Sequence, residues 1–393
     1  MSAPEVVIVS AKRTPIGAFL GVLSPLSAVQ LGAVAARAAV EAAGIAPGDV
    51  QEVIMGCVLS ANLGQAPARQ AALGGGVPQG VPATTVNKMC GSALKAVMMA
   101  ADQIRAGGAE VVLAGGLESM SNAPYLLPKA RSGYRMGHGE VIDHMLKDGL
   151  QSPFDGKSMG CFADNTASKY GFTRAQQDAF ATESVRRAMQ ALQAGDFDLE
   201  VAPVTVKGRK GETVIPRDET PGTCDASKIT SLKPAFNKDG TVTAASSSSI
   251  SDGAAALVLM SAKTADARGL KPLARVVAYA SHAHEPEWFT TAPVGAIRKV
   301  LAQLGWKPHD ADLYEINEAF AVVAMAAMCD IDIDHARVNV NGGACALGHP
   351  IGATGARILT TLLHTLRRRG GKRGIASLCI GGGEAVALAV EML

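Results

Sequence analysis

The sequence predicts an α/β protein built from two related halves with a loop-rich segment inserted between them. Three observations support this fold class: short apolar runs alternate with helix-like segments, two distant segments share a pattern, and the composition changes between them. Strand-then-helix alternation is typical of parallel sheets with helices on their faces. With 48% hydrophobic residues among 393, the chain can bury a large core.

The predicted elements follow from periodicity and from turn residues. Residues 6–9 read VVIV, a short apolar strand, and residues 31–43 have the composition of a helix that Gly44 ends. A second helix-like stretch covers residues 294–304 and precedes Gly305. A Pro turn and an apolar strand follow each of these two glycines, which predicts the same local structure twice.

The two segments form an internal repeat, and the second copy lies 261 residues after the first. Residues 44–56 (GIAPGDVQEVIMG) and 305–317 (GWKPHDADLYEIN) each place Pro three residues after Gly and Asp two further on, ahead of a strand. Adding 261 to the number of Cys90 gives position 351, which is two residues from His349. Cys90 and His349 each begin a helix-like segment after a Gly-containing turn. Because equivalent elements of two packed halves face each other across a pseudo-dyad, Cys90 and His349 are predicted to meet.

The segment between the halves differs in composition from both. Residues 122–249 are rich in Gly, Pro, Lys and Asp, and they contain a polar helix expected over 173–194. This predicts a loop domain that lies over the core. The N-terminal half is then assigned to residues 1–121 with 250–270, and the C-terminal half to residues 271–393.

Charge and cysteine usage exclude several classes of protein. The formal net charge is +2, which gives no argument for a nucleic acid or an anionic membrane as partner. The N-terminal segment has early charges and does not resemble a signal peptide. Seven cysteines form no CxxC pair and no metal-ligand spacing with the eight histidines. We therefore expect reduced thiols, no metal site and a cytoplasmic location.

Cys90 has two interpretations from local sequence alone. It follows a β-branched run and precedes a helix-like run, so the helix dipole and free N–H groups would lower its pKa and favour the thiolate. The alternative is a small residue that fits a tight turn between a strand and a helix. The residue pattern alone favours this second, structural interpretation.

Three further residues also have both a functional and a structural interpretation. His349 lies between glycine-rich turns, NGGACALG and IGATG, where the backbone either approaches a ligand or merely turns, and Pro350 is expected at the first helical position. Cys379 precedes three glycines and is either filler in a strand or an accessible thiol. Asn317 ends an apolar strand and is a plausible helix N-cap, a structural role that needs no ligand.

Four motifs together resemble the thiolase family: NKMCGSALKAV, EINEAFA, NVNGGACALGHPIGATGAR and LCIGGGEA, in order and in register over essentially the whole chain. The resemblance implies a thiolase fold, with two duplicated βαβαβαββ halves in a layered α-β-α-β-α arrangement. It also implies that the inserted loop domain holds coenzyme A and contributes oligomer contacts. A homotetramer, as a dimer of dimers, is expected.

The resemblance also assigns chemical roles. Cys90 is expected to accept the acyl group, His349 to act as its base, and Cys379 to remove a proton from the Cα of acetyl-CoA. Backbone N–H groups of Cys90 and Gly381 are expected to bind the tetrahedral oxyanion. His349 and a water held by Asn317 would bind the enolate oxygen.

The implied activity is an acetyl-CoA C-acetyltransferase that condenses two acetyl-CoA into acetoacetyl-CoA and coenzyme A, reversibly and by ping-pong chemistry. The alternative is a degradative 3-ketoacyl-CoA thiolase of broader chain length. A decarboxylating condensing enzyme and a non-catalytic acyl-CoA carrier are more remote alternatives. Coenzyme A and acetyl-CoA are expected as substrates, with no permanently bound cofactor.

Nine positions match the family's coenzyme A contacts. Most are apolar and suit pantetheine, whereas Arg217 is a candidate near the adenine and phosphates; the positions are Leu150, Met159, Arg217, Leu232, Phe236, Ala244, Ser248, Ala319 and Phe320. The chain departs from short-chain relatives at Ser158, Ser246, the Phe289–Thr290 pair and Cys345. These departures leave the preferred acyl-chain length open.

Overall fold

Five strands form the first part of the sheet in this computed structural model, which describes residues 4–209 and 211–393. Their spatial order is β4-β3-β5-β10-β1. β3 runs parallel to β4 and β5, and β10 runs antiparallel to β5 and β1. The bounds are β1 Val6–Arg13, β3 Glu52–Gly56, β4 Ala83–Val86, β5 Val111–Ser119 and β10 Ser251–Ser261, with the short β2, Gly17–Ala18, paired to β10.

Four strands repeat this arrangement in the second part of the chain, in the order β12-β13-β14-β11. β12 runs parallel to β13, and β14 runs antiparallel to β13 and β11. A single parallel bridge between Tyr314 and Val338 stands where the counterpart of β4 would be. The bounds are β11 Ala274–Ala283, β12 Leu313–Ile316, β13 Arg373–Ile380 and β14 Glu384–Met392. The predicted internal repeat is therefore present in the topology.

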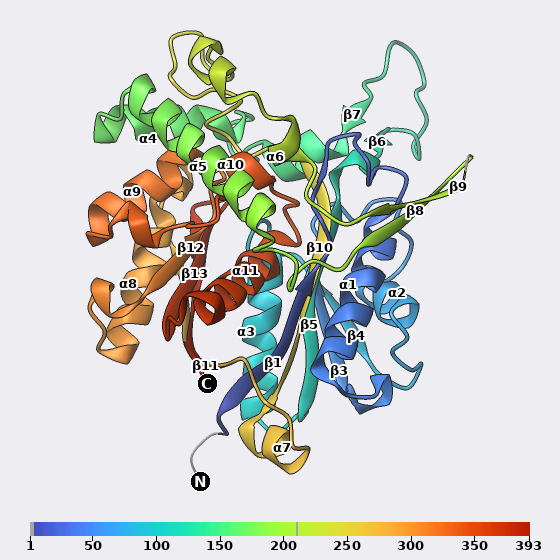
Figure 1. Cartoon of the computed structure of the whole chain (residues 1–393). Coiled ribbons are helices and arrows are strands. Elements are labelled where there is room, and N and C mark those ends of the chain that lie inside the picture. The colour runs from blue at the N-terminus through green and yellow to red at the C-terminus, as the bar shows by residue number, and fades with distance from the viewer. Residues whose placement is uncertain (1–3, 210) are drawn as a thin grey trace.

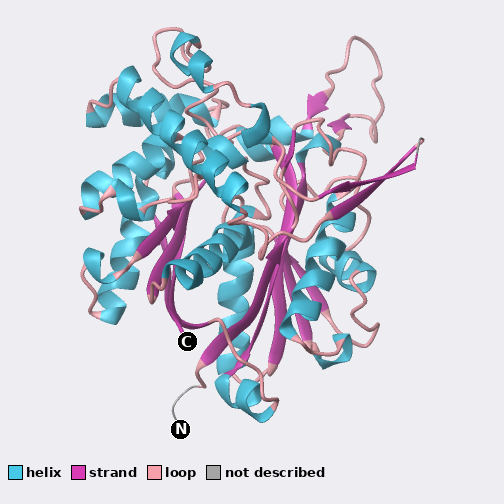
Figure 2. Ribbon diagram, viewed as in Figure 1, coloured by secondary structure: helices cyan, strands magenta, loops and turns pink. Residues whose placement is uncertain are grey.

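The two sets of strands join where Val7 and Ile8 of β1 pair with Arg275 and Ala274 of β11, and elsewhere they diverge with helices between them (Figure 2). α3 (Ser92–Arg105) and α11 (Thr354–Arg369) form this middle layer and contact strands of both halves (Figure 1). α1 (Ala28–Ala43) and α2 (Pro67–Gly74) cover one outer face, and α8 (Ala292–Leu304) and α9 (Ala321–Ile331) cover the other. This is the predicted α-β-α-β-α order.

The two middle helices approach closely at their N-terminal ends. A Cβ added at Gly355 of α11 would lie 2.3 Å from the backbone nitrogen of Leu94 in α3, so only glycine allows this contact. Cys90 lies just before α3 and His349 lies shortly before α11. The packing of the two helices therefore brings their preceding turns to the same end of the molecule, beyond the carboxyl ends of β4 and β13.

The inserted segment contains the predicted polar helix. α5 spans Arg174–Ala194, and the hydroxyl of Thr173 accepts a hydrogen bond from Gln176 in a capping box at its start. The other elements here are α4 Met159–Tyr170, α6 Thr220–Thr223, a π-helical turn Leu146–Leu150, a 3₁₀ helix Ala226–Ser231, β6 Tyr125–Leu126, β7 Ile142–Asp143, β8 Val204–Gly208 and β9 Gly211–Ile215. Long loops connect them, as the composition predicts.

A buried arginine ties the insertion to the sheet. Arg13 at the end of β1 has no exposed surface, and its guanidinium pairs with Glu200 at 2.6 Å and with Asp218 at 2.7 Å. Both carboxylates belong to the inserted segment, and Asp218 also accepts the backbone N–H of Ile16. Removing one partner of such a buried pair would leave an uncompensated charge, so this contact fixes the insertion over the strand ends.

The remaining elements are short: α7 Ala262–Ala267, α10 Ala344–Leu347, and 3₁₀ helices at Pro47–Asp49, Met120–Asn122, Pro286–Thr291, Pro308–Asp310 and His335–Arg337. The predicted domain boundaries at 121/122, 249/250 and 270/271 stay a prediction, and residues 1–3 and 210 within them lie outside the described residues. Within that described part, no helix combines the length and hydropathy needed to cross a bilayer.

Candidate active site

The turn that carries Cys90 is held by its neighbours. Met89 has a positive φ of 47°, unusual for a residue with a side chain. The hydroxyl of Ser92 donates to the carbonyl of Met89 at 2.6 Å and accepts the N–H of Lys88 at 2.8 Å. A Cβ at Gly91 would lie 2.4 Å from the side chain of Ile380, so the turn packs directly on the end of β13. Cys90 is thereby placed beside the strand that contains Cys379.

Cys90 is half-buried and lines an apolar pocket. Burial raises the pKa of its thiol to about 11, although backbone N–H groups of Gly381 and of Cys90 itself lie against the sulfur and oppose the shift. The sequence-based expectation of a lowered pKa is wrong, because the cost of burying a thiolate exceeds the stabilisation from the helix start and these N–H groups. In the resting protein Cys90 is a neutral thiol.

His349 lies in the loop between α10 and α11 and lines the same pocket. Its backbone N–H donates to the carbonyl of Ser249 at 3.1 Å, and its ring Nδ1 lies 2.7 Å from the hydroxyl of Thr354. Its Nε2 is buried without a hydrogen-bond partner among the described residues. Burial, with a smaller contribution from Arg357, lowers the pKa of His349 to about 3. The ring is therefore neutral at physiological pH and can accept a proton.

Residue 348, directly before His349, must be glycine because of its backbone conformation and its close packing. Gly348 has φ +105°, and a Cβ there would lie 2.1 Å from the hydroxyl of Ser251. The helix after His349 begins later than the sequence suggests: α11 starts at Thr354, so Pro350 lies in the preceding turn and not at the first helical position. The correction matters because Thr354, the first helical residue, is the one that reaches the His349 ring.

Cys379, on β13, and Asn317, directly after the neighbouring strand β12, lie behind the pocket surface. Cys379 is fully buried near the end of β13, close enough to Cys90 for a charge on one to affect the other, and burial raises the pKa of its thiol. Asn317 follows β12, and its backbone N–H donates to Ser377 of β13 at 3.0 Å. α9 begins at Ala321 after Phe320, so Asn317 does not cap it. Both polar atoms of the buried Asn317 side chain lack a partner in the described structure.

The pocket between these residues and the insertion is mostly apolar and has a volume of about 550 Å³. Seven of the nine predicted coenzyme A contacts line it: Leu150, Met159, Phe236, Ala244, Ser248, Ala319 and Phe320. Gly381, Cys90 and His349 also lie on its wall. Leu232 and Arg217 do not line it; Arg217 borders a separate small hollow beside Phe197. Sequence reasoning missed Phe19, which belongs to none of the four motifs, and gave no role to Ile351, which lies two residues after His349 within one of them.

A buried carboxylate connects the loops of the two halves. Glu118, at the end of β5, accepts the backbone N–H groups of Val58 and Leu59 at 3.1 Å each and that of Gly352 at 2.9 Å. Gly352 lies three residues after His349, so this contact holds the His349 loop against the first half. Burial raises the pKa of Glu118 to about 7, although its hydrogen bonds oppose that change. Sequence reasoning did not single out Glu118, because only its partners in the fold give it this role.

Comparisons with known proteins agree with this geometry. The chain matches the family models for the thiolase N-terminal domain over residues 6–263 and for the thiolase C-terminal domain over residues 270–392. This chain belongs to the thiolase family. The predictions of family, fold and acyltransferase class are thereby confirmed.

Several acetyl-CoA acetyltransferases are similar to this thiolase over nearly its full length. The protein of that name from Cupriavidus necator is 52% identical over 391 residues, which cover 98% of this chain and 99% of the relative. Acetyl-CoA acetyltransferase 2 of Arabidopsis thaliana is 52% identical over 99% of this chain and 97% of its own. The crystal structure of the Bacillus anthracis acetyl-CoA acetyltransferase superposes with a TM-score of 0.97 at 44% identity and covers 100% of both chains.

The departures from short-chain relatives lie at different depths in this thiolase. Ser158 and Phe289 line the pocket, whereas Thr290 is buried behind it with its hydroxyl 2.5 Å from that of Thr166. Ser246 and Cys345 are also buried. Ser246 accepts the backbone N–H of Thr243, and the backbone N–H of Cys345 donates to Glu318. Only Ser158 and Phe289 can therefore contact a ligand directly.

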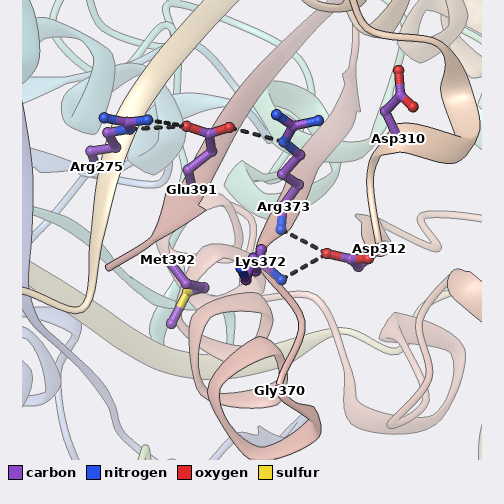
Figure 3. Close-up of a pocket in the computed structure, with 8 residues that line it drawn as sticks. All are labelled: Arg275, Asp310, Asp312, Gly370, Lys372, Arg373, Glu391 and Met392. Carbon is purple, nitrogen blue, oxygen red and sulfur yellow. Dashed lines mark hydrogen bonds and ion pairs between the residues drawn. The ribbon is translucent and has the colours of Figure 1, made fainter.

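A second hollow of similar volume, about 560 Å³, lies at the opposite, polar end of β14 and differs in character (Figure 3). Several of its charged groups have partners: Glu391 pairs with Arg275 and Arg373, and Asp312 accepts the backbone N–H groups of Lys372 and Arg373. Among the described residues, no cysteine or histidine lines this hollow, so the apolar pocket at Cys90 remains the candidate site.

Proposed function

We propose that this thiolase is an acetyl-CoA C-acetyltransferase that condenses two acetyl-CoA into acetoacetyl-CoA and coenzyme A. The observation that carries the proposal is the convergence of Cys90 and His349 on one apolar pocket, with Cys379 buried close behind Cys90. The names of the relatives from Cupriavidus necator and Arabidopsis thaliana support the same reaction. The roles of Cys90, His349, Asn317 and Gly381, and that of Cys379 as base, were predicted from sequence; the proton transfer from Cys379 to coenzyme A was not, and all are proposals for this chain.

The first half-reaction transfers the acetyl group to Cys90. The thiol of Cys90 attacks the thioester carbonyl while its proton passes to the free Nε2 of His349, because the resting thiol is neutral. The N–H groups of Cys90 and Gly381 stabilise the oxyanion of the tetrahedral intermediate; losing one such donor typically costs about 10² to 10³ in rate. As the C–S bond to coenzyme A breaks, the neutral thiol of Cys379 protonates the leaving thiolate. Acetyl-Cys90, a Cys379 thiolate and protonated His349 remain, and in this intermediate each opposite charge favours the other, unlike in the neutral resting site.

The second half-reaction forms the carbon–carbon bond. The Cys379 thiolate removes a proton from the methyl group of a second acetyl-CoA, and the resulting enolate attacks the carbonyl of acetyl-Cys90. Protonated His349 and a water held by Asn317 stabilise the enolate oxygen, which fits the unpartnered polar atoms of the Asn317 side chain. The Cys90 thiolate then leaves and recovers its proton from His349. Every group returns to its starting protonation state.

Acyl-CoA is proposed to enter as substrate, with no permanently bound cofactor. The apolar walls suit pantetheine, and Leu150, Met159, Phe236 and Phe320 are the proposed main contacts. Leu232 and Arg217, both outside the pocket wall, are weaker proposals, Leu232 for pantetheine and Arg217 for the adenine and phosphates. The loop domain, residues 122–249, and the two halves around it keep the boundaries predicted from sequence.

The assembly and the compartment are further proposals. Large apolar side chains are exposed on the inserted segment, where they would be covered in the proposed homotetramer: Tyr125, Leu127, Met136, Val141 and Phe154. A cytoplasmic location is supported by seven cysteines that all occur as free thiols. Light scattering of the purified protein would separate a tetramer from a dimer.

The degradative 3-ketoacyl-CoA thiolase remains the second candidate, because Ser158 and Phe289, two departures from short-chain relatives, line the pocket. Thiolysis rates with 3-ketoacyl-CoA substrates of four, six, eight and more carbons separate the two. A rate that is highest at four carbons supports the proposal, and a rate that is highest at long chains supports the degradative enzyme.

The remote alternatives have their own tests. A decarboxylating condensing enzyme would require malonyl-CoA and would not depend on Cys379. A non-catalytic acyl-CoA carrier would bind acetyl-CoA without ever acetylating Cys90. Condensation from acetyl-CoA alone, lost in Cys379→Ser, would exclude both.

A further inference from the structure

A hydrogen-bonded pair behind His349 fixes which ring nitrogen can act as the base. Nδ1 of His349 lies 2.7 Å from the hydroxyl oxygen of Thr354, and that oxygen lies 2.9 Å from the carbonyl oxygen of Pro350. The exposed fraction is 5% for His349 and 0% for Thr354, so water does not compete for these groups. The only other ring nitrogen, Nε2, has no partner among the described residues and belongs to the residue that lines the pocket.

The direction of these bonds follows from the number of protons available. A carbonyl oxygen only accepts, so the contact with Pro350 uses the single hydroxyl proton of Thr354. The hydroxyl can then only accept at its other contact, so Nδ1 of His349 carries the proton. The opposite tautomer would lose the bond to Pro350 and would bury an unpartnered Nε2–H, and orphaned buried N–H groups are rarer than orphaned acceptors.

We propose that Thr354 is a positioning residue that holds His349 as its Nδ1–H tautomer and thereby leaves the Nε2 lone pair free to take the proton of Cys90. The inference rests on the proposed role of His349 as base. Thr354 touches neither substrate nor reacting atoms, and it acts only through the ring.

The loop geometry supports a fixed ring. The N–H of Gly352 is held by Glu118, and a Cβ at Gly116 of β5 would lie 2.1 Å from the carbonyl oxygen of Gly352. The loop that follows His349 is therefore packed against β5 without free space. The backbone contacts therefore fix the position of the loop, and the hydroxyl of Thr354 fixes the tautomer and the orientation of the His349 ring.

The tautomer can be read directly in the full-length protein by ¹⁵N NMR of histidine-labelled enzyme, with the His349 signals assigned by their loss in His349→Gln. We expect a protonated, pyrrole-like Nδ1 and an unprotonated, pyridine-like Nε2 at neutral pH. A protonated Nε2 in the wild-type enzyme would overturn the proposal, whatever the effect of any substitution.

Kinetics of variants give a second, independent test. Thr354→Val keeps the shape but cannot accept from Nδ1, so single-turnover acetylation of Cys90 should slow at least about 10-fold with KM for acetyl-CoA within about twofold. Thr354→Ser should restore most of the rate. Thr360→Val is the matched control, because Thr360 is equally buried on α11 and makes the same bond to the carbonyl four residues earlier, at Ala356, without contacting the site.

The outcomes separate this inference from the proposed function. Wild-type acetylation rates in Thr354→Val, or an equal loss in Thr360→Val, would overturn the role of Thr354. If instead His349→Gln acetylated Cys90 at the wild-type rate, His349 would not be the base, although the tautomer measured by NMR would stand. If Thr354→Val did not fold, the wild-type spectrum and Thr354→Ser would still decide the matter.

Discussion

Replacing His349 by Gln is expected to change how acetylation of Cys90 depends on pH. The Cys90 thiol has a pKa of about 11, so at pH 7.5 only about 3 × 10⁻⁴ of the molecules carry a thiolate. With His349 present, the proton leaves during attack and the thiolate need not form first. His349→Gln removes that route, so only the preformed thiolate can react.

The magnitude follows from that fraction. Forming the thiolate in water at pH 7.5 costs about 5 kcal/mol, at about 1.36 kcal/mol per pH unit below the pKa. We expect the acetylation rate of His349→Gln at pH 7.5 to fall about 10³-fold, within the range known for general-base catalysis. The rate should then rise about tenfold per pH unit toward pH 10. The wild-type rate should vary little from pH 6 to 9, because the pKa of His349 is lowered to about 3.

The assay is single-turnover acetylation, with the enzyme in excess over acetyl-CoA, quenched at intervals and read by intact-mass spectrometry at each pH. Cys90→Ser provides the blank. A His349→Gln rate that is independent of pH and within tenfold of the wild-type rate would refute the reasoning, since the thiol would then need no neighbouring base.

Three further predictions concern other parts of the site. Cys379→Ser loses the acid for the leaving thiolate and the base for acetyl-CoA, so acetylation of Cys90 should continue more slowly and condensation should fall further, about 10² to 10⁴-fold; unchanged condensation, followed as acetoacetyl-CoA formation, would remove Cys379 from the mechanism. Phe289, which packs edge-on against Phe162 and Phe320, borders the pocket, so Phe289→Ala should raise thiolysis of six- and eight-carbon substrates relative to the four-carbon one by about tenfold per folded molecule. An unchanged ratio would show that Phe289 does not limit chain length. Glu118 has a folded pKa raised to about 7 from 4.5, so the folded state holds its proton to higher pH and loses stability as pH rises through that interval. The free energy of unfolding of the wild type relative to Glu118→Gln should therefore drop by about 3 kcal/mol between pH 4.5 and 8. Urea unfolding at fixed protein concentration measures this difference, and a constant difference would contradict the raised pKa.

The fold could be predicted from the sequence because the two halves repeat local signals. Gly44 and Gly305 both end a helix in the left-handed conformation, with φ of 68° and 64°, and each precedes a 3₁₀ turn and a strand. These signals depend only on a few neighbouring residues, so they can be recognised from the sequence alone. The pairing of Cys90 with His349 followed from the same repeat, because symmetry relates the starts of α3 and α11.

The chemistry of the site could not be predicted in the same way. The pKa of Cys90 depends on how deeply the thiol is buried between elements distant in sequence, and local reasoning from the helix start gave the wrong direction. Glu118 and Thr354 stand out only when their partners are known, because a carboxylate or a hydroxyl has no special meaning until it lies beside Gly352 or the His349 ring. Asn317 looked like a helix cap, yet its helix begins four residues later.

The account rests on Cys90 as the residue that carries the acyl group. The most direct measurement is peptide mapping by mass spectrometry of wild-type enzyme quenched during turnover with acetyl-CoA, with Cys379→Ser used to accumulate the intermediate. The account predicts one acetyl group per chain, on Cys90, which free coenzyme A removes. An enzyme that forms acetoacetyl-CoA while Cys90 stays unmodified, or that carries the acetyl group on another cysteine, would contradict it.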